Sequence, residues 1–169
     1  MSNNRTFGAL GLSLFLAACS GGAQPEAAPA PAHVNPNAPV VGPAGDVERA
    51  TFGSELKVDL SKMIRRPSGL YVQDFETGTG SVAATGRTAV LRYIGYLANG
   101  KQFDAGEITI TLGTNRVIKA WEDGVLGMRV GGRRRLVSPP HLAYGTKGAP
   151  PTIPSNAVLV FDMELEQVY

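Results

Sequence analysis

Side chains alternate strictly between two sets from residue 157 to residue 166. The first set is apolar throughout and consists of Ala157, Leu159, Phe161, Met163 and Leu165. The second set contains two valines and three carboxylates. Because successive side chains of a β-strand point to opposite faces of its sheet, the pattern predicts a strand with one buried face and one wetter face. The C-terminal end of the chain is therefore expected to lie in a half-buried sheet.

Four further segments are predicted to be strands, because apolar, β-branched and aromatic residues recur in them. They cover residues 69–76, 88–98, 107–112 and 133–138. Asn99-Gly100 lies between the second and the third of these segments and is a strong hairpin signal. Residues 101–104 are then expected to begin the returning strand.

One segment has helical periodicity instead. Its apolar stripe consists of Val117, Ile118, Trp121, Val125 and Met128. Glycines follow the stripe and can end the helix. One amphipathic helix against about five antiparallel strands is an α+β architecture. Helix and sheet together are expected to enclose the aromatic side chains Tyr93, Phe103, Trp121, Tyr144 and Phe161.

The first 18 residues have the features of an export signal. A polar start with one cation, Arg5, precedes an apolar run over residues 9–18. Such a run is about half the ~20 residues that a membrane-spanning helix needs, so residues 1–18 are predicted to be a signal peptide. Leu16-Ala17-Ala18-Cys19 resembles the lipobox of bacterial lipoproteins, in which the cysteine becomes the acylated N-terminus. A plain signal peptide is the alternative.

A composition rich in Ala, Pro and Gly sets residues 19–53 apart from the rest of the chain. Such a segment buries too little apolar surface to offset the entropy of ordering it, which predicts a disordered linker. A spacer between membrane and domain is the preferred interpretation, and a docking site for proline-binding partners is the alternative. The folded domain is predicted to cover residues 54–169.

The location follows from the same signal. Ser20, not Asp, follows Cys19, which resembles the outer-membrane default of Gram-negative lipoproteins. The protein is therefore expected in the cell envelope, anchored by lipid and facing the periplasm or the exterior, with the outer membrane favoured in a Gram-negative host.

Charge and composition exclude several classes of function. The net charge is only +2, with 16 basic and 14 acidic residues, so no nucleic-acid partner is expected. One cysteine and two distant histidines, His33 and His141, predict neither a disulfide nor a metal site. No GxSxG elbow is present. We therefore expect no cofactor and no nucleophilic chemistry.

Several motifs, in this order, resemble the FKBP family of peptidyl-prolyl isomerases. They are Tyr93-Ile94-Gly95, residues 99–104, Leu112-Gly113, residues 117–125, residues 128–132, Ala143-Tyr144-Gly145, Ile153-Pro154 and residues 159–165. The resemblance runs from about Ser68 to the end of the chain. It implies a five- or six-stranded antiparallel sheet wrapped around one short helix, in agreement with the periodicities.

The resemblance also implies an aromatic pocket between helix and sheet. Its predicted catalytic residues are Tyr93, Phe103, Asp104, Trp121, Tyr144 and Phe161. Its predicted substrate-binding residues are Val117, Ile118, Ile153, Ile108 and Leu142. Trp121 would form the floor, while the Ile153 N–H and the Tyr144 hydroxyl would hold substrate carbonyls. Without the resemblance, an aromatic residue such as Trp121 is more simply a core residue, and Asp104 a turn residue.

The implied activity is rotation about X-Pro bonds during the folding of extracytoplasmic proteins. The implied partners are proline-containing clients, macrolides such as tacrolimus and rapamycin, and the membrane through the lipid anchor. The protein itself is expected to be a monomer. A chaperone-like or adaptor module that binds proline with little turnover is one alternative, and a structural lipoprotein that has lost the activity is another.

Some positions depart from the family pattern. Ile108 stands where the family often has phenylalanine, which predicts a wider pocket and weaker macrolide binding. The connection at residues 105–107 is short and the usual cation partner of Asp104 is missing, so this carboxylate is expected to be held differently.

Arg133, Arg134 and Arg135 are expected to be exposed cations without a function.

Overall fold

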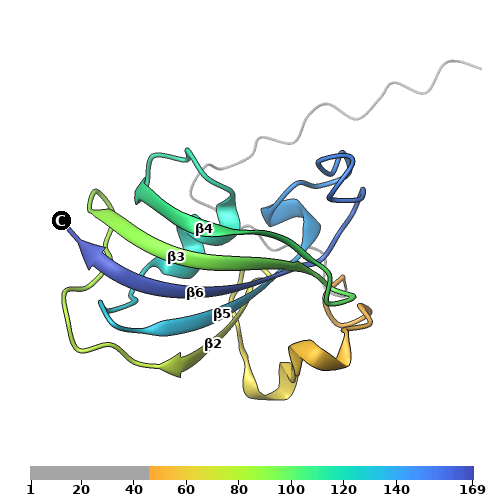
Figure 1. The fold of residues 1–169 in the computed structure, drawn as a ribbon, viewed down its shortest axis with the longest axis horizontal. Helices are drawn as coiled ribbons and strands as arrows, with labels where there is room; N and C mark the ends of the chain where they lie inside the picture. Colours follow the sequence, from red (N-terminus) through yellow and green to blue (C-terminus); the bar gives the residue numbers. More distant parts are fainter. Residues whose placement is uncertain (1–45) are drawn as a thin grey trace, which may run out of the picture. The chain divides into compact units, whose positions relative to one another are not determined.

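The computed structural model describes residues 46–169. The predicted signal peptide, Cys19 and most of the predicted linker lie outside the described residues. Figure 1 shows the described part as one twisted sheet with a short helix against it. No helix within this part is both long and apolar enough to cross a bilayer.

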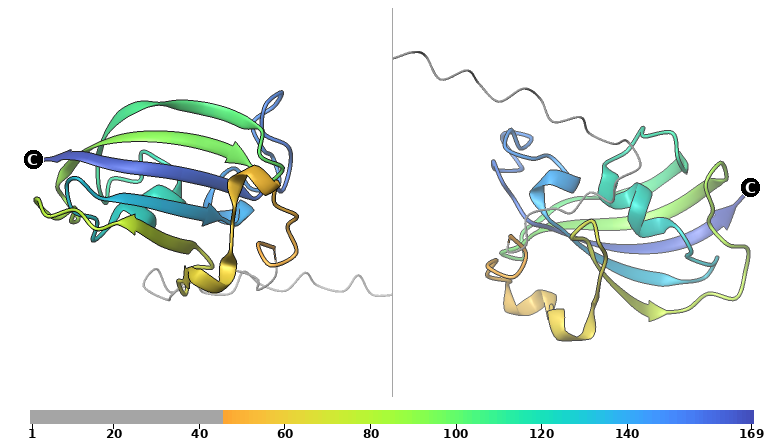
Figure 2. Two further views of the ribbon diagram at one scale, coloured as in Figure 1. Left: turned by 60° about the horizontal axis from the view of Figure 1, so that its bottom comes forward. Right: turned by 180° about the vertical axis from the view of Figure 1, so that it is seen from behind.

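The sheet has six strands in the order β1-β2-β5-β6-β3-β4, and all neighbouring strands are antiparallel. Their bounds are β1 Ile64–Arg65, β2 Tyr71–Glu76, β3 Thr88–Leu97, β4 Gln102–Thr111, β5 Arg133–Ser138 and β6 Leu159–Val168. The helix α1, Lys119–Val125, lies across one face of this sheet (Figure 2, right). The predicted α+β architecture is therefore confirmed.

Several boundaries differ from the prediction. The helix is shorter than its apolar stripe, because Ile118 and Leu126 at its two ends have non-helical ψ angles of 148° and 132°. β4 is one strand of ten residues, where a start at 101–104 and a separate segment at 107–112 were expected. The two-residue strand β1 and the short 3₁₀ turns Ser54–Leu56, Leu60–Lys62 and Pro140–Leu142 were not predicted.

The main core lies between α1 and the face of the sheet that the helix covers, here called the concave face. Leu91, Leu136 and Leu159 are completely buried there. The other inward residues predicted for the C-terminal strand also pack here: Phe161, Met163 and Leu165 are at most 3% exposed. The prediction that the apolar set of the last strand is buried is thus confirmed for these residues.

A second, smaller core covers one end of the opposite, convex face. Val137, Val158 and Val160 pack there against Val47 and Leu56 of the N-terminal segment. This segment lies at the end of the sheet opposite the C-terminus (Figures 1 and 2). The face that was predicted to be wetter is therefore buried at this end. Packing also begins before residue 54, because Val47 is only 2% exposed.

Two of the three consecutive arginines are buried, which corrects the expected surface patch. Arg134 and Arg135 are 7% and 9% exposed. The Arg134 guanidinium donates to both carboxylate oxygens of Asp74 at 2.6 and 2.9 Å, and Arg135 donates to both of Asp162 at 2.6 Å. β5 has neighbours on both sides, so its arginines meet carboxylates on β2 and β6, and such two-pronged pairs are strong.

Arg134 also joins the helix to the sheet. Its Nη1 donates to the carbonyl oxygens of Gly124 and Leu126, at 2.8 and 3.3 Å. These carbonyls lie at the C-terminal end of α1, where no further turn of helix can satisfy them. One side chain therefore caps the helix and ties it to β2 through Asp74.

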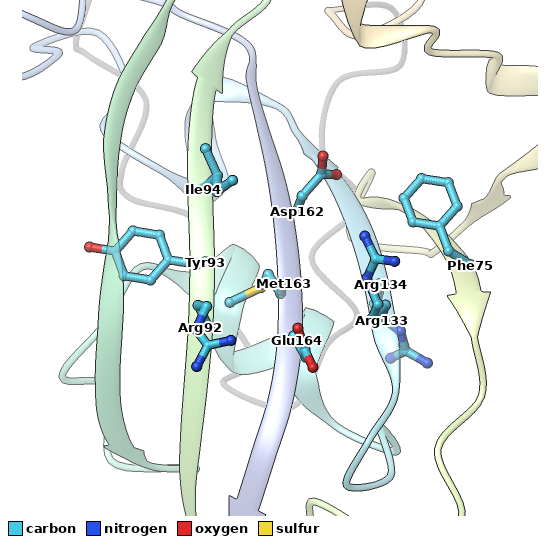
Figure 3. A pocket seen from close by; sticks show the side chains of 9 residues that line it. All are labelled: Phe75, Arg92, Tyr93, Ile94, Arg133, Arg134, Asp162, Met163 and Glu164. Atoms are coloured by element: carbon cyan, nitrogen blue, oxygen red, sulfur yellow. The ribbon is translucent and has the colours of Figure 1, made fainter.

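The third arginine lies on the convex face. Figure 3 views this face, with the helix behind the sheet. Arg133, Phe75 and Glu164 border a shallow hollow of about 100 Å³ there. Phe75 is half exposed, and the Arg135 guanidinium stacks over its ring at 5.1 Å from the centroid.

Replacing Gly124 with alanine is expected to lower the free energy of unfolding by about 1–3 kcal/mol, the usual effect of overpacking a core. A Cβ atom at Gly124 would lie 2.3 Å from Leu136 Cδ1. This clash outweighs the roughly 1 kcal/mol by which alanine is preferred over glycine inside a helix. Urea denaturation of parent and variant measures the difference.

The control is the same change in a Leu136→Ala background, where Gly124→Ala should destabilise much less, because the facing side chain has been shortened. A Gly124→Ala variant at least as stable as the parent would contradict this contact.

Candidate active site

A hollow of about 460 Å³ lies between α1 and the concave face of the sheet. Its lining comes from β3, β4, β6, the loop before α1, the helix itself and the loop after residue 142. The lining residues are Tyr93, Phe103, Asp104, Ile108, Asn115, Arg116, Val117, Ile118, Trp121, Tyr144 and Phe161. All six predicted catalytic residues are thus brought together, with three of the five predicted substrate-binding residues.

Four aromatic rings line the hollow in an edge-to-face chain. The Tyr93 and Trp121 rings are 4.7 Å apart, Trp121 and Phe161 are 5.5 Å apart, and Phe161 and Phe103 are 5.9 Å apart. Such edge-to-face pairs hold each ring in a fixed orientation. Trp121 and Phe161 are 6% and 2% exposed, so these residues belong to the core and line the hollow at the same time.

The β3–β4 hairpin positions Phe103 and Asp104. Gly100 has a φ of +90° and its N–H donates to the Leu97 carbonyl at 2.9 Å, which closes a tight turn at the predicted place. Gly95 then pairs with Asp104 and Tyr96 with Gln102, so that Phe103 is an extra residue in β4. A bulge of this kind re-aims side chains, and here Phe103 and Asp104 both reach the hollow.

Gly95 leaves room for the Phe103 ring. A Cβ atom at this position would lie 2.7 Å from Phe103 Cζ and 3.1 Å from both Cε atoms. These distances are too short for any side chain to be added without moving the ring. The glycine on β3 therefore lets the ring lie flat against its own hairpin.

Asp104 is held by hydrogen bonds. The Tyr93 hydroxyl donates to Asp104 Oδ2 at 2.7 Å, and the Ala105 N–H donates to Oδ1 at 3.0 Å. Within residues 46–169, no lysine or arginine forms an ion pair with this carboxylate. In this part of the chain, Asp104 is thus held by the Tyr93 hydroxyl and the Ala105 N–H.

The same contact changes the acidity of Tyr93. Burial and the hydrogen bond to the Asp104 carboxylate raise the pKa of Tyr93 to about 12, with burial the larger cause. The phenol is therefore protonated at physiological pH and remains a donor to Asp104.

The loop before the helix forms part of the wall of the hollow, and Glu122 fixes the shape of this loop. The Glu122 carboxylate accepts hydrogen bonds from the Gly113 and Asn115 N–H groups, at 2.6 and 2.8 Å. Asn115 has a φ of +53°, a conformation that asparagine tolerates better than most residues. Asn115 and Arg116 line the hollow but were not predicted, although their place directly before Val117 was the signal that could have found them.

Ile118 offers a backbone donor in this wall. It is the N-cap of α1, and its N–H has no acceptor within residues 46–169. The hydroxyl of Tyr144 also has no partner in this part of the chain, and Tyr144 is 40% exposed. Both donors lie in the lining and can reach a bound ligand.

Two predicted substrate-binding residues are not in the lining. Ile153 and Leu142 are 4% and 3% exposed and pack in the main core. The Ile153 N–H donates to the Ala149 carbonyl at 2.9 Å, so in this structure it is not free to bind a substrate carbonyl as predicted. Both residues lie in the long loop of residues 139–158, where no periodicity indicates which side chains turn inward.

The chemistry open to this hollow is binding and orientation. Its ionisable residues are Asp104, Arg116 and two tyrosines. Among residues 46–169, no group of three or more His, Cys, Asp or Glu side chains could hold a metal ion. An aromatic floor with a fixed carboxylate and two free donors at its rim suits a ligand that is apolar in the centre and carries backbone carbonyls around it.

The Tyr93–Asp104 contact predicts a specific pH dependence of stability. Because the folded-state pKa of Tyr93 is about 12 and the ordinary value is 10, its contribution is complete below pH 10 and is lost as pH rises toward 12. The stability advantage of the parent over Tyr93→Phe should therefore shrink across this window. Urea denaturation at pH 9 and pH 11 measures it.

Tyr71 also has a raised pKa, caused first by burial, but it is present in both proteins and cancels in the difference. An advantage that stays constant between the two pH values would contradict the raised pKa of Tyr93.

Comparison with known proteins gives the family. The family model described as FKBP-type peptidyl-prolyl cis-trans isomerase matches residues 80–166. FK506-binding protein 4 of Dictyostelium discoideum is 46% identical over 114 residues, which are 66% of this chain and 31% of that protein. An FK506-binding protein of Neisseria meningitidis is 42% identical over 106 residues, covering 60% of this chain and 97% of the relative.

Solved structures agree. AtFKBP13 superposes with a TM-score of 0.60 at 36% identity, over 63% of this chain and 98% of that one. FkpA from Escherichia coli gives a TM-score of 0.59 at 35% identity, over 68% of this chain and 55% of that one. The chain spans less than a third of the length of the FK506-binding protein 4 relatives. Because the family model matches residues 80–166, which is more than half of the chain, the chain belongs to the FKBP-type peptidyl-prolyl cis-trans isomerase family.

Proposed function

We propose that this protein is a peptidyl-prolyl cis-trans isomerase whose active site is the hollow between α1 and the concave face. The observation that carries the proposal is the chain of four aromatic rings from Tyr93 to Phe103, with Asp104 fixed at its rim. The ring of a proline fits an apolar cup of this kind. The neighbouring peptide groups would then lie at the polar rim.

The reaction needs no bond to be made or broken. Rotation about an X-Pro amide is slow because its barrier is about 18–20 kcal/mol, although the cis and trans forms are close in energy. In the twisted state the amide loses resonance and its carbonyl loses part of its charge. A dry apolar site disfavours the planar, more polar amide and so favours the twisted state, which is the differential binding that accelerates a reaction.

The rim groups hold the substrate in register. The free Ile118 N–H and the Tyr144 hydroxyl donate to carbonyls on either side of the proline. Asp104 presents a fixed carboxylate to backbone N–H groups, since Tyr93 and the Ala105 N–H prevent it from turning away. Trp121 supports the proline ring from below.

The test is a protease-free isomerisation assay on the purified full-length protein with a proline tetrapeptide. Phe103→Ala and Trp121→Ala are each expected to lower kcat/KM about tenfold or more, a loss of about 1.4 kcal/mol in transition-state stabilisation. Phe75→Ala is the matched control, because Phe75 is an exposed aromatic residue on the convex face.

Absence of acceleration by a well-folded parent would refute the enzyme proposal. If that parent still bound proline peptides, the binding-module alternative would replace it. Tacrolimus (FK506) should inhibit the active parent by competing for the hollow, as the name of the FK506-binding relatives suggests. It should inhibit the parent more weakly than a variant that has an aromatic residue in place of Ile108.

We also propose that the protein acts outside the cytoplasm, anchored through Cys19 and assisting clients as they fold after export. The support is the lipobox-like Leu16-Ala17-Ala18-Cys19 and the proline-rich stretch that follows it. In a Gram-negative host the outer membrane is the favoured location. The domain would work there as a monomer.

Replacing Cys19 with alanine is expected to abolish incorporation of an alkyne-labelled fatty acid and to release the protein from the membrane fraction, because one buried acyl CH₂ contributes about 0.8 kcal/mol and several chains anchor stably. Ser20→Ala is the control and should leave labelling unchanged. A parent chain that carries no label would refute the lipid anchor without affecting the isomerase proposal.

A further inference from the structure

The strand β4 forms a long free edge of the sheet. It is the last strand in the sheet order and pairs only with β3 (Figure 1). Ala105, Gly106, Glu107 and Thr109 are all exposed. The opposite edge, β1, has only two residues. β4 is therefore the longest free edge among the strands of residues 46–169, since on the other side only residues 73–76 of β2 are left uncovered.

The hydrogen-bonding pattern shows which backbone groups of β4 face outward. Leu112 N–H donates to the Arg87 carbonyl at 3.0 Å, so this residue is bonded toward β3. In an antiparallel pair the bonded residues alternate, which places Ile110, Ile108 and Gly106 in the same inward set. The N–H and C=O groups of Ala105, Glu107 and Thr109 consequently point away from the sheet.

Both ends of this edge are already satisfied. The Ala105 N–H donates to Asp104 Oδ1 at 3.0 Å, and the Thr111 carbonyl accepts from Thr114 Oγ1 at 2.7 Å. Between them, the Ala105 carbonyl, both backbone groups of Glu107 and Thr109, and the Thr111 N–H have no partner within residues 46–169. These six groups have the spacing that a further strand would need.

Little in β4 protects this edge, because Glu107 is the only charged side chain among residues 105–111. Sheets commonly block free edges with proline, charged side chains such as lysine, bulges or short strands. β4 has neither proline nor lysine, and its bulge lies at Phe103, before the free groups begin. The same strand contributes Phe103, Asp104 and Ile108 to the hollow. The free edge therefore begins at the wall of the site.

We propose that β4 binds the extended segment of a client polypeptide next to the proline held in the hollow, as an added strand on its free edge. This inference rests on the proposed function and adds the class of substrate that the site favours. Main-chain hydrogen bonds supply the affinity in such pairing, so it tolerates many client sequences. The favoured substrate is an unfolded chain that is extended beside its proline and has no second proline there.

The test compares two substrates with the same proline centre, a tetrapeptide and a peptide about six residues longer on each side. Thr109→Pro is the test variant. It removes an outward N–H that takes no part in the β3–β4 ladder, and proline is tolerated at such edge positions. Thr109→Ala is the matched control, because it changes the side chain and keeps the N–H.

For the parent, the long peptide should have a kcat/KM about tenfold above that of the tetrapeptide. Thr109→Pro should retain the tetrapeptide activity within about twofold and lose most of the advantage of the long peptide, while Thr109→Ala should keep it. A long peptide with N-methylated amides beside the proline should lose the same advantage with the parent protein. The N-methylated peptide tests whether main-chain hydrogen bonds to β4 produce this advantage even if Thr109→Pro fails to fold.

Equal activity on both peptides, or an advantage unaffected by N-methylation, would overturn the proposal. A parent inactive even on the tetrapeptide would refute the isomerase proposal alone, and affinities for the long peptide and its N-methylated form would then test the edge. A second copy of this chain is the other possible occupant of the edge, and analytical sedimentation tests for it. A parent dimer that Thr109→Pro dissociates would show that a second copy covers the edge and would overturn the proposal.

Discussion

The packing of one short helix against a curved sheet is the contact on which the site depends. A helix of seven residues is not stable alone in water, because forming its first turn is unfavourable and few bonds follow. α1 therefore persists only through its contacts with the sheet: Gly124 lets it approach Leu136, and Arg134 caps its last carbonyls. These contacts fix the position of Trp121, and Trp121 orients the rings on either side of it.

Several groups of the site come from places where regular structure is interrupted, whereas Tyr93, Trp121 and Phe161 lie within regular elements. Phe103 and Asp104 reach the hollow through a bulge, and the free N–H of Ile118 exists because a helix begins there. Glu122 holds the loop before the helix with two backbone hydrogen bonds. The sheet and the helix hold the aromatic side chains in place, and an unpaired donor such as the Ile118 N–H is available where a regular element begins or ends.

The sequence predicted the elements whose residues follow a period. Alternation in the last strand and the Asn-Gly hairpin signal are local patterns, and both appear in the structure. The apolar stripe located α1 but overestimated its length, since only Trp121 and Val125 of its five residues lie within the helix. The sequence could not show which side chains of the loop at residues 139–158 turn inward, so Leu142 and Ile153 were misplaced. The sequence pattern also could not predict that Arg134 is buried. Its partner Asp74 lies 60 residues away in the chain and is brought close only by the strand order.

A site that works by shape places different demands on its residues from a site that transfers protons. None of the described contacts in the hollow activates a nucleophile, and the pKa of Tyr93 is raised away from physiological pH. What has to be exact is the placement of rings and backbone donors. Small residues such as Gly95 and Gly124 therefore matter as much as the aromatic side chains, since each marks a close approach that a single added methyl group would prevent.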